Sequence, residues 1–250
     1  MSGERRRLDL ALEMRGLLRS RARARDAVLR GTVTVHGVVA TKPGMLVGDA
    51  DTIALDDPAA RYVSRAALKL IAGLDAAAIE VAGRVCLDVG ASTGGFTQVL
   101  LERDAARVYA VDVGHGQLYP RIVADARVVS LEGLNARDLD HTHVPDPIEL
   151  LVCDVSFVSV TKVLTPPLRL CGPGADAVIL IKPQFEAGRE HIGKGGIVTD
   201  GAAIAHAEAG VVAFMASAGW TQLVSLPSPI EGGDGNRETV SVFRRQPGSV

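Results

Sequence analysis

The chain has 250 residues, of which 47% are hydrophobic and 22% charged, and its formal net charge is −2. These values are typical of a globular protein and exclude a disordered, collagen-like or coiled-coil chain. No apolar run approaches the roughly 18 residues that a membrane-spanning helix needs. The cysteines form no CxxC or His/Cys cluster, so we expect no zinc site. Acidic residues interrupt the arginine-rich start and no signal-peptide core follows it, which favours a reducing cytoplasm.

Charge is unevenly distributed, because residues 1–69 carry +5 and the remainder carries −7. Leucines at helical spacing predict a first helix that breaks at Gly16. Ser20 is expected to cap a second helix that ends at Gly31. Alternating valines on either side of His36-Gly37 predict a hairpin, and a strand at Thr52–Leu55 closes the small sheet.

Nine arginines and no lysine lie within residues 1–30. The planar arginine fork donates two parallel hydrogen bonds to phosphate, so the module is predicted to bind RNA or DNA. The alternative is that these arginines only solvate two small helices. The candidate RNA-binding residues, one of them beyond this module, are Arg5, Arg6, Arg7, Arg19, Arg21, Arg23, Arg25, Lys42 and Arg65.

The order of motifs along this module resembles the S4 RNA-binding domain. The resemblance rests on Arg7-Leu8-Asp9, Ser20-Arg21, Gly31, Lys42-Pro43 and Asp51-Thr52-Ile53, among others, and it covers most of residues 7–56. His36 departs from the family pattern, where Asn is common. The resemblance implies a basic helix face for structured RNA. We expect an S4-like α+β domain at 1–58, a linker at 59–64 and a second domain at 65–250.

In the second domain, short β-rich runs alternate with helical stretches. This alternation predicts an α/β, Rossmann-like, mainly parallel sheet that binds ligands at the carboxyl ends of its strands. The expected helices are Arg65–Ala77, Gly95–Arg103, Val160–Leu170 and Gly201–Ala218. The expected strands are Val85–Val89, Val108–Val111, Val128–Leu131, Leu150–Asp154, Ala177–Ile181, Gln222–Leu226 and Thr239–Phe243.

The first of these strands runs into a glycine-rich loop that begins at Asp88. Ser92 stands where the NAD fingerprint requires glycine, and an acid ahead of the loop suits a ligand with an ammonium group better than a pyrophosphate. Asp112 ends the next strand, where a carboxylate can accept hydrogen bonds from ribose hydroxyls. Together these features predict S-adenosylmethionine (SAM) and resemble SAM-dependent methyltransferases; the alternatives are a tight turn without ligand and, at 135–138, an ordinary polar turn. The candidate cofactor-binding residues are Asp88, Gly90, Ala91, Ser92, Gly94, Gly95, Phe96, Asp112, Asn135, Ala136 and Asp154.

Two charged residues, Asp154 and Lys182, end neighbouring apolar strands and are expected at the ligand-bearing edge. A surface ion pair is the alternative. Methyl transfer to a ribose hydroxyl requires removal of its proton, and a lysine can accept a proton only when burial or nearby positive charge favours its neutral form. Lys69 and Glu238 are further candidates, although spacing alone does not select them.

A second resemblance selects them. Ser64–Leu70, Asp154–Phe157, Ile181–Glu186 and Gly235–Glu238 resemble the corresponding segments of FtsJ-type ribose 2'-O-methyltransferases, and the Asn-Pro-Pro-Tyr signature of amino-group methyltransferases is absent. The family's Lys-Asp-Lys-Glu tetrad falls on Lys69, Asp154, Lys182 and Glu238. The resemblance implies that Lys182 is the base, that Asp154 and Lys69 tune and orient it, and that Glu238 positions the acceptor.

The combination of both halves resembles the TlyA, or haemolysin A, family of bacterial ribosomal RNA methyltransferases. That resemblance implies 2'-O-methylation of cytidine, with ribosomal RNA or ribosomal subunits as partners. Two other functions stay open, a membrane-active cytolysin and a non-catalytic RNA-binding assembly factor. No stable membrane association is expected, and the pattern leaves the target nucleotide, the subunit and the oligomeric state undetermined.

Overall fold

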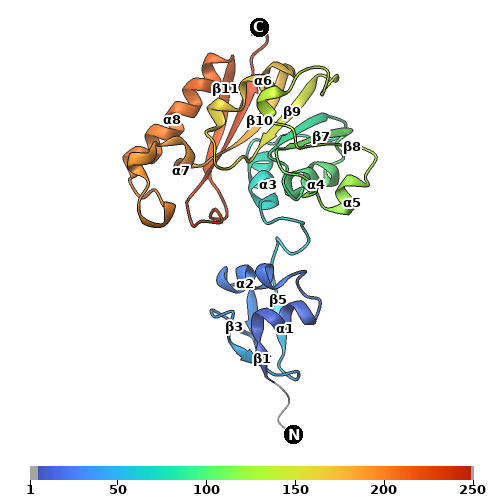
Figure 1. Ribbon diagram of the computed structural model, residues 1–250, viewed down its shortest axis with the longest axis vertical. Helices are drawn as coiled ribbons and strands as arrows, with labels where there is room; N and C mark the ends of the chain where they lie inside the picture. The colour runs from blue at the N-terminus through green and yellow to red at the C-terminus, as the bar shows by residue number, and fades with distance from the viewer. Residues whose placement is uncertain (1–4, 249–250) are drawn as a thin grey trace. The chain divides into compact units, whose positions relative to one another are not determined.

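The computed structural model describes residues 5–248, which divide into two compact units between Arg61 and Tyr62 (Figure 1). Each unit has its own hydrophobic core. No helix in the described part of the chain is both long and apolar enough to cross a membrane.

The first unit packs two helices on short antiparallel strands. Strands β2, β3 and β5 form a sheet in the order β3-β2-β5, and β1 pairs with β4. Its core contains leucines from the first helix and valines from the sheet. The elements are β1 (Arg6–Arg7), α1 (Leu8–Met14), α2 (Arg21–Leu29), β2 (Val33–Val35), β3 (Val38–Val39), β4 (Leu46–Val47) and β5 (Ile53–Leu55).

Local signals set the ends of these elements as the sequence predicts. The Ser20 hydroxyl accepts the backbone N–H of Arg23 at 3.3 Å, which confirms the predicted N-cap of α2. His36 and Gly37 both have positive φ, 52° and 78°, the conformation that a two-residue hairpin turn requires. The hairpin β2–β3 is therefore confirmed.

The second unit contains a seven-stranded sheet in the order β11-β12-β10-β9-β6-β7-β8. Five neighbouring strands run parallel, and β12 runs antiparallel to β10 and β11. This arrangement confirms the predicted α/β class with a mainly parallel sheet. The strands are β6 (Val85–Val89), β7 (Arg107–Asp112), β8 (Val128–Glu132), β9 (Ile148–Cys153), β10 (Cys171–Ile181), β11 (Trp220–Pro227) and β12 (Thr239–Arg245).

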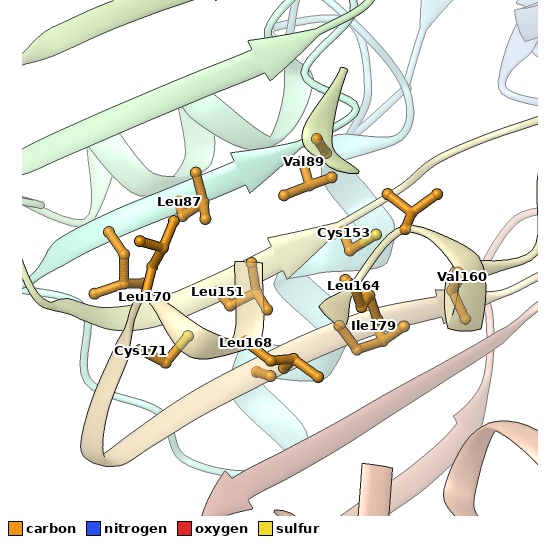
Figure 2. Close-up of a cluster of buried hydrophobic side chains, with 14 of the residues drawn as sticks. Leu87, Val89, Leu151, Cys153, Val160, Leu164, Leu168, Leu170, Cys171 and Ile179 are labelled. Carbon is orange, nitrogen blue, oxygen red and sulfur yellow. The ribbon is translucent and has the colours of Figure 1, made fainter. Parts of the chain in front are cut away.

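Helices cover both faces of this sheet, as Figure 1 shows. Alternate side chains of each strand point to opposite faces, which produces two cores. One core lies against α3, α4 and α5, and the other lies against α6 and α8. Figure 2 shows part of the second core, with Leu168 of α6 among its labelled side chains. The helices are α3 (Ala67–Ala76), α4 (Gly95–Glu102), α5 (Pro120–Val123), α6 (Thr165–Arg169), α7 (Pro183–Glu186) and α8 (Gly201–Ser217), with short 3-10 turns η1 (Ala136–Asp138), η2 (Val160–Lys162), η3 (Arg189–His191) and η4 (Lys194–Gly196).

The continuous helix predicted over Val160–Leu170 is wrong. The chain forms the short turn η2 and then the separate helix α6, which begins at Thr165. Pro166 and Pro167 occupy the first turn of α6, where their missing N–H groups cost nothing. Farther inside a helix the same prolines would remove hydrogen bonds and clash with the preceding turn.

Gly73 permits close packing between α3 and the sheet. A Cβ at this position would lie 2.8 Å from a methyl carbon of Val178 on β10 and 2.8 Å from one of Val240 on β12. Because real carbon atoms do not approach so closely, the small residue fixes how near α3 lies to these two strands. The spacing matters for the site, since α3 carries Lys69.

A buried carboxylate organises the first unit. Asp9 is 2% exposed, and its oxygens accept two hydrogen bonds from Arg7 at 3.0 and 2.9 Å and one from Arg21 at 3.1 Å. These bonds, chiefly those from Arg7, lower the pKa of Asp9 to about 2, although burial opposes the change. The ionised carboxylate thus joins β1 and α1 to the start of α2.

Substitution of Gly73 by Ala is expected to destabilise the second unit by about 1–3 kcal/mol, because the added methyl group forces α3 away from β10 and β12. Gly210→Ala on α8 is the matched control, since a Cβ there meets nothing within 4 Å. That substitution is expected to be neutral or to stabilise by up to about 1 kcal/mol, the helix-propensity difference. Thermal unfolding measures both, and equal effects would contradict the packing argument.

Asp9→Asn is expected to destabilise the first unit by about 2 kcal/mol near pH 7. The folded-state pKa is depressed, so the stabilisation is complete above the unfolded value near 4 and is lost as the pH falls toward 2. The stability difference between wild type and variant should therefore shrink over that range. Hydrogen exchange of the α1 amides measures it, with the exposed Asp49→Asn as control; a difference independent of pH would contradict this account.

Candidate active site

The glycine loop between β6 and α4 lies against the end of β9. Gly90 has φ +85°, and a Cβ there would lie 2.8 Å from the carbonyl oxygen of Asp154. Glycine is therefore required both by the left-handed backbone and by the close approach of the two strand ends. The loop and Asp154 consequently line the same space.

The structure places Asp88 behind this loop rather than at its open side. Asp88 is fully buried, and one oxygen accepts a 2.6 Å hydrogen bond from the Thr97 hydroxyl of α4. Burial raises the pKa of Asp88 to about 7. Asp88 lines neither of the cavities at this edge of the sheet, so it supports the loop from within the core.

A cavity of about 580 Å³ opens at the carboxyl ends of β6, β7 and β9. The Asp112 carboxylate lies in its wall and is oriented by the backbone N–H groups of Ser92 at 2.9 Å and Gly114 at 2.7 Å. The carboxylate can still accept further hydrogen bonds, as from the hydroxyls of a ribose. The predicted cofactor residues in this wall are Gly90, Ser92, Asp112, Asn135, Ala136 and Asp154.

A smaller cavity of about 160 Å³ adjoins the first and shares Gly90, Ser92, Asp154 and Ser156 with it. The predicted residues Ala91, Gly95 and Phe96 line only the smaller cavity, together with Lys182. SAM consists of a nucleoside and an amino-acid portion, and the two cavities suit these parts, the larger one the nucleoside and the smaller one the amino acid. The residues present therefore fit SAM.

Gly94 lines neither cavity. A Cβ there would lie 3.1–3.3 Å from side-chain carbons of Leu118 and Ile122, so glycine allows these two residues to pack closely against the loop. Arg137, part of the candidate loop at 135–138, also lines the wall of the larger cavity, whereas Gly114, Gln117, Ser156 and Phe157 were not among the candidate residues. The Asp154–Phe157 motif contained a signal for the last two, whereas nothing in the sequence indicated that the 114–117 loop folds back over the cavity.

Four charged side chains meet beside the smaller cavity. Lys182 Nζ lies 2.7 Å from Asp154 Oδ1, and Lys69 Nζ lies 3.8 Å from Asp154 Oδ2. Lys69 also donates to Glu238 Oε2 at 2.5 Å, and Lys182 donates to Ser156 Oγ at 2.8 Å. The structure thus brings together all four members of the predicted tetrad.

Strand order explains how residues so far apart in sequence meet. Asp154 and Lys182 follow the parallel neighbours β9 and β10. Glu238 immediately precedes the antiparallel β12, whose first residue Thr239 pairs with Ile181, so Glu238 lies beside Lys182. At most 12% of each of the four side chains is exposed, and their formal charges cancel. Of the four, only Asp154 and Lys182 line a cavity.

Many basic residues of the first unit have partners within the protein. Several guanidinium groups bind protein oxygens: Arg5 donates to the Leu46 carbonyl, Arg6 pairs with Asp49, Arg7 and Arg21 share Asp9, and Arg23 donates to the Ala59 carbonyl. Arg5, Arg7 and Arg21 are nonetheless exposed, as are Arg19, Arg25 and Lys42. Arg65, which belongs to the second unit, is half-buried. Some of the arginines therefore stabilise the unit itself, which a count of charges does not reveal.

Comparisons with known proteins agree with both units. Residues 62–245 match the FtsJ-like methyltransferase family, and residues 6–53 match the S4 domain. The 16S/23S rRNA (cytidine-2'-O)-methyltransferase TlyA of Mycobacterium tuberculosis is 43% identical over 97% of this chain and 91% of its own length. Hemolysin A of Brachyspira hyodysenteriae is 39% identical over 95% of this chain and 99% of its own.

A solved structure, described as a putative hemolysin from Streptococcus thermophilus, superposes with a TM-score of 0.76 at 36% identity, covering 97% of this chain and 89% of that one. The range matched by the FtsJ-like family contains the glycine loop, Asp112 and all four clustered charges. The chain therefore belongs to the TlyA family, in which an S4 domain precedes an FtsJ-like, SAM-dependent methyltransferase domain.

Proposed function

We propose that this protein transfers a methyl group from SAM to the 2'-hydroxyl of cytidine in ribosomal RNA. The substrate in the name of the Mycobacterium tuberculosis relative supports this choice. The observation that carries the proposal is the position of Lys182, whose amine lines the smaller cavity and is held there by Asp154 and Ser156. A proton acceptor thus stands beside the space that fits the cofactor's amino-acid portion.

Each clustered residue has a task in this reaction. SAM, when bound, would supply an activated methyl carbon on its sulfonium. Lys182 Nζ would accept the proton that the 2'-hydroxyl loses as its oxygen takes the methyl group from sulfur. Asp154 holds the amine at the cavity through their 2.7 Å contact. Lys69 lies 3.8 Å from the other carboxylate oxygen of Asp154 and so helps to orient that side chain.

Glu238 is assigned to Lys69 rather than to the acceptor. Its carboxylate contacts the Lys69 amine at 2.5 Å and lines neither cavity. The carboxylate balances the charge of Lys69, since an unpaired ammonium at this depth would be costly. The resemblance implies instead that Glu238 positions the acceptor, whereas the contact with Lys69 supports the charge-balancing role.

Lys182→Met is expected to lower the rate of methyl transfer to ribosomal RNA by at least 100-fold, because the positioned proton acceptor is removed. SAM affinity should change little, since Gly90, Ser92 and Asp112 remain in place. Transfer of labelled methyl groups to ribosomes or subunits, with mapping of ribose methylation, measures the rate, and calorimetry measures SAM binding. The exposed Lys162→Met on η2 is the control.

Ribose methylation retained in Lys182→Met would contradict the proposed base. Wild-type protein that binds RNA but neither binds SAM nor transfers methyl groups would instead favour a non-catalytic assembly factor.

The S4 domain is proposed to supply affinity for structured ribosomal RNA, through exposed groups such as Arg25 on α2 and Lys42 in the loop before β4. Phosphate contacts release counterions, so binding weakens as salt rises. The double variant Arg25→Ala, Lys42→Ala is expected to weaken RNA binding and to reduce the slope of log K against log salt by about 1.5. SAM affinity should be unchanged.

Filter binding over a salt series measures the slope. The matched control is Arg103→Ala, which removes a charge paired with Asp75 on the second unit. An unchanged slope in the double variant, or an equal loss in the control, would argue against this binding surface.

A further inference from the structure

Glu186 is a half-buried carboxylate at the end of α7, four residues after Lys182. Its two oxygens accept hydrogen bonds from the segment that follows β9, one from the Ser159 hydroxyl at 2.6 Å and one from the Val160 backbone N–H at 2.8 Å. Desolvation raises the pKa of Glu186, which shows that burial works against its charge. The tetrad makes no use of this group.

Two further contacts join the same pair of segments. Lys182 Nζ donates to Ser156 Oγ at 2.8 Å, and the Phe185 and Phe157 rings are in tilted contact with centroids 5.6 Å apart. The contacts follow one another in order along both segments, from Ser156 to Val160 on one side and from Lys182 to Glu186 on the other. Residues 156–160 are thus held against the segment that carries Lys182, and Glu186 makes the last of these contacts.

The segment of residues 156–160 forms part of the cofactor cavity. Ser156 lines both cavities, and Phe157 and Val158 line the larger one. Phe157 has φ +67° although it is not glycine, and its side chain is 91% exposed. Such a backbone conformation is sparsely populated and persists only where the surroundings impose it. Because most of Phe157 faces solvent, the restraint comes from the Phe185 ring and from neighbouring residues of the segment.

We propose that Glu186 is a positioning residue that holds residues 156–160 in register with Lys182. Through Ser159 and Val160 it fixes the end of the segment, and through the segment it fixes the cavity wall and the Ser156 hydroxyl that contacts the Lys182 amine. Glu186 touches neither cavity, so it acts only through these residues. The part of this inference that concerns turnover rests on the proposed role of Lys182; the part that concerns SAM does not.

The chemistry of the two hydrogen bonds selects the test variants. Glu186→Ala removes both acceptors. Glu186→Gln keeps both contacts, because an amide oxygen can accept from Val160 and the amide nitrogen can donate to the Ser159 hydroxyl. Glu190→Ala, at an exposed position in the following turn η3, is the matched control.

Glu186→Ala is expected to weaken SAM binding about 5- to 10-fold, to speed hydrogen exchange of the amides of residues 158–160 at least 10-fold, and to lower kcat on ribosomal subunits at least 10-fold. Glu186→Gln should stay within about 3-fold of wild type in all three. All measurements are made on the full chain well below its thermal transition, and circular dichroism verifies that each variant is folded.

Unchanged SAM affinity and unchanged exchange in folded Glu186→Ala would overturn the inference, and so would a Gln variant as impaired as the Ala variant. Uniformly faster exchange throughout the second unit would also overturn it, because that is the result of general destabilisation. SAM affinity and exchange are measured without RNA, so the positioning role is judged independently of the proposed substrate. Failure of the proposed base appears separately, as activity retained in Lys182→Met.

Discussion

One carboxylate, that of Asp154, joins the main parts of the catalytic unit. The backbone carbonyl oxygen of Asp154 lies against Gly90, and its side chain lies near the amines of Lys182 and Lys69. Asp154 also lines both cavities. Buried charges persist only when they are paired, and removal of one partner usually costs several kcal/mol. The cluster is therefore a constraint on the fold as well as a source of chemistry, since β9 and β10 must end, and α3 and β12 must begin, where their charges meet.

Strand positions and the glycine loop could be predicted because they depend on local sequence. Apolar runs define β6 to β12, and Gly90 is needed wherever a loop of this kind meets a neighbouring strand. The short elements β1, β4, α5 and α7 were missed, since two to four residues contain no period that can be recognised. Tertiary contacts determine such elements, as the register between β1 and β4 illustrates.

The site was harder to predict, for two physical reasons. Lys69 and Glu238 are 169 positions apart in the sequence, and only their family resemblance selected them before the register of β10 and β12 was known. Asp88 shows the second reason. The sequence placed it at the right strand end, but the face on which its side chain falls depends on the pleat of β6, and that face belongs to the core against α4.

The arginines of the first unit likewise could not be assigned to RNA binding or to internal contacts from sequence alone. Arg7 and Arg21 appear in the sequence as available positive charge, yet both are held by the buried Asp9. Charge composition reports how many cations a module has, and only coordinates report which of them are committed to internal partners. The unit uses the same residue type to hold its helices together and to cover its exposed surface.

The reversed direction of β12 has a consequence for how the charged cluster is assembled. Because this strand runs against its neighbours, its first residues arrive at the edge where the parallel strands finish, and Glu238 completes a cluster begun by Lys69. Without β12, the two lysine amines of the cluster would share the single carboxylate of Asp154.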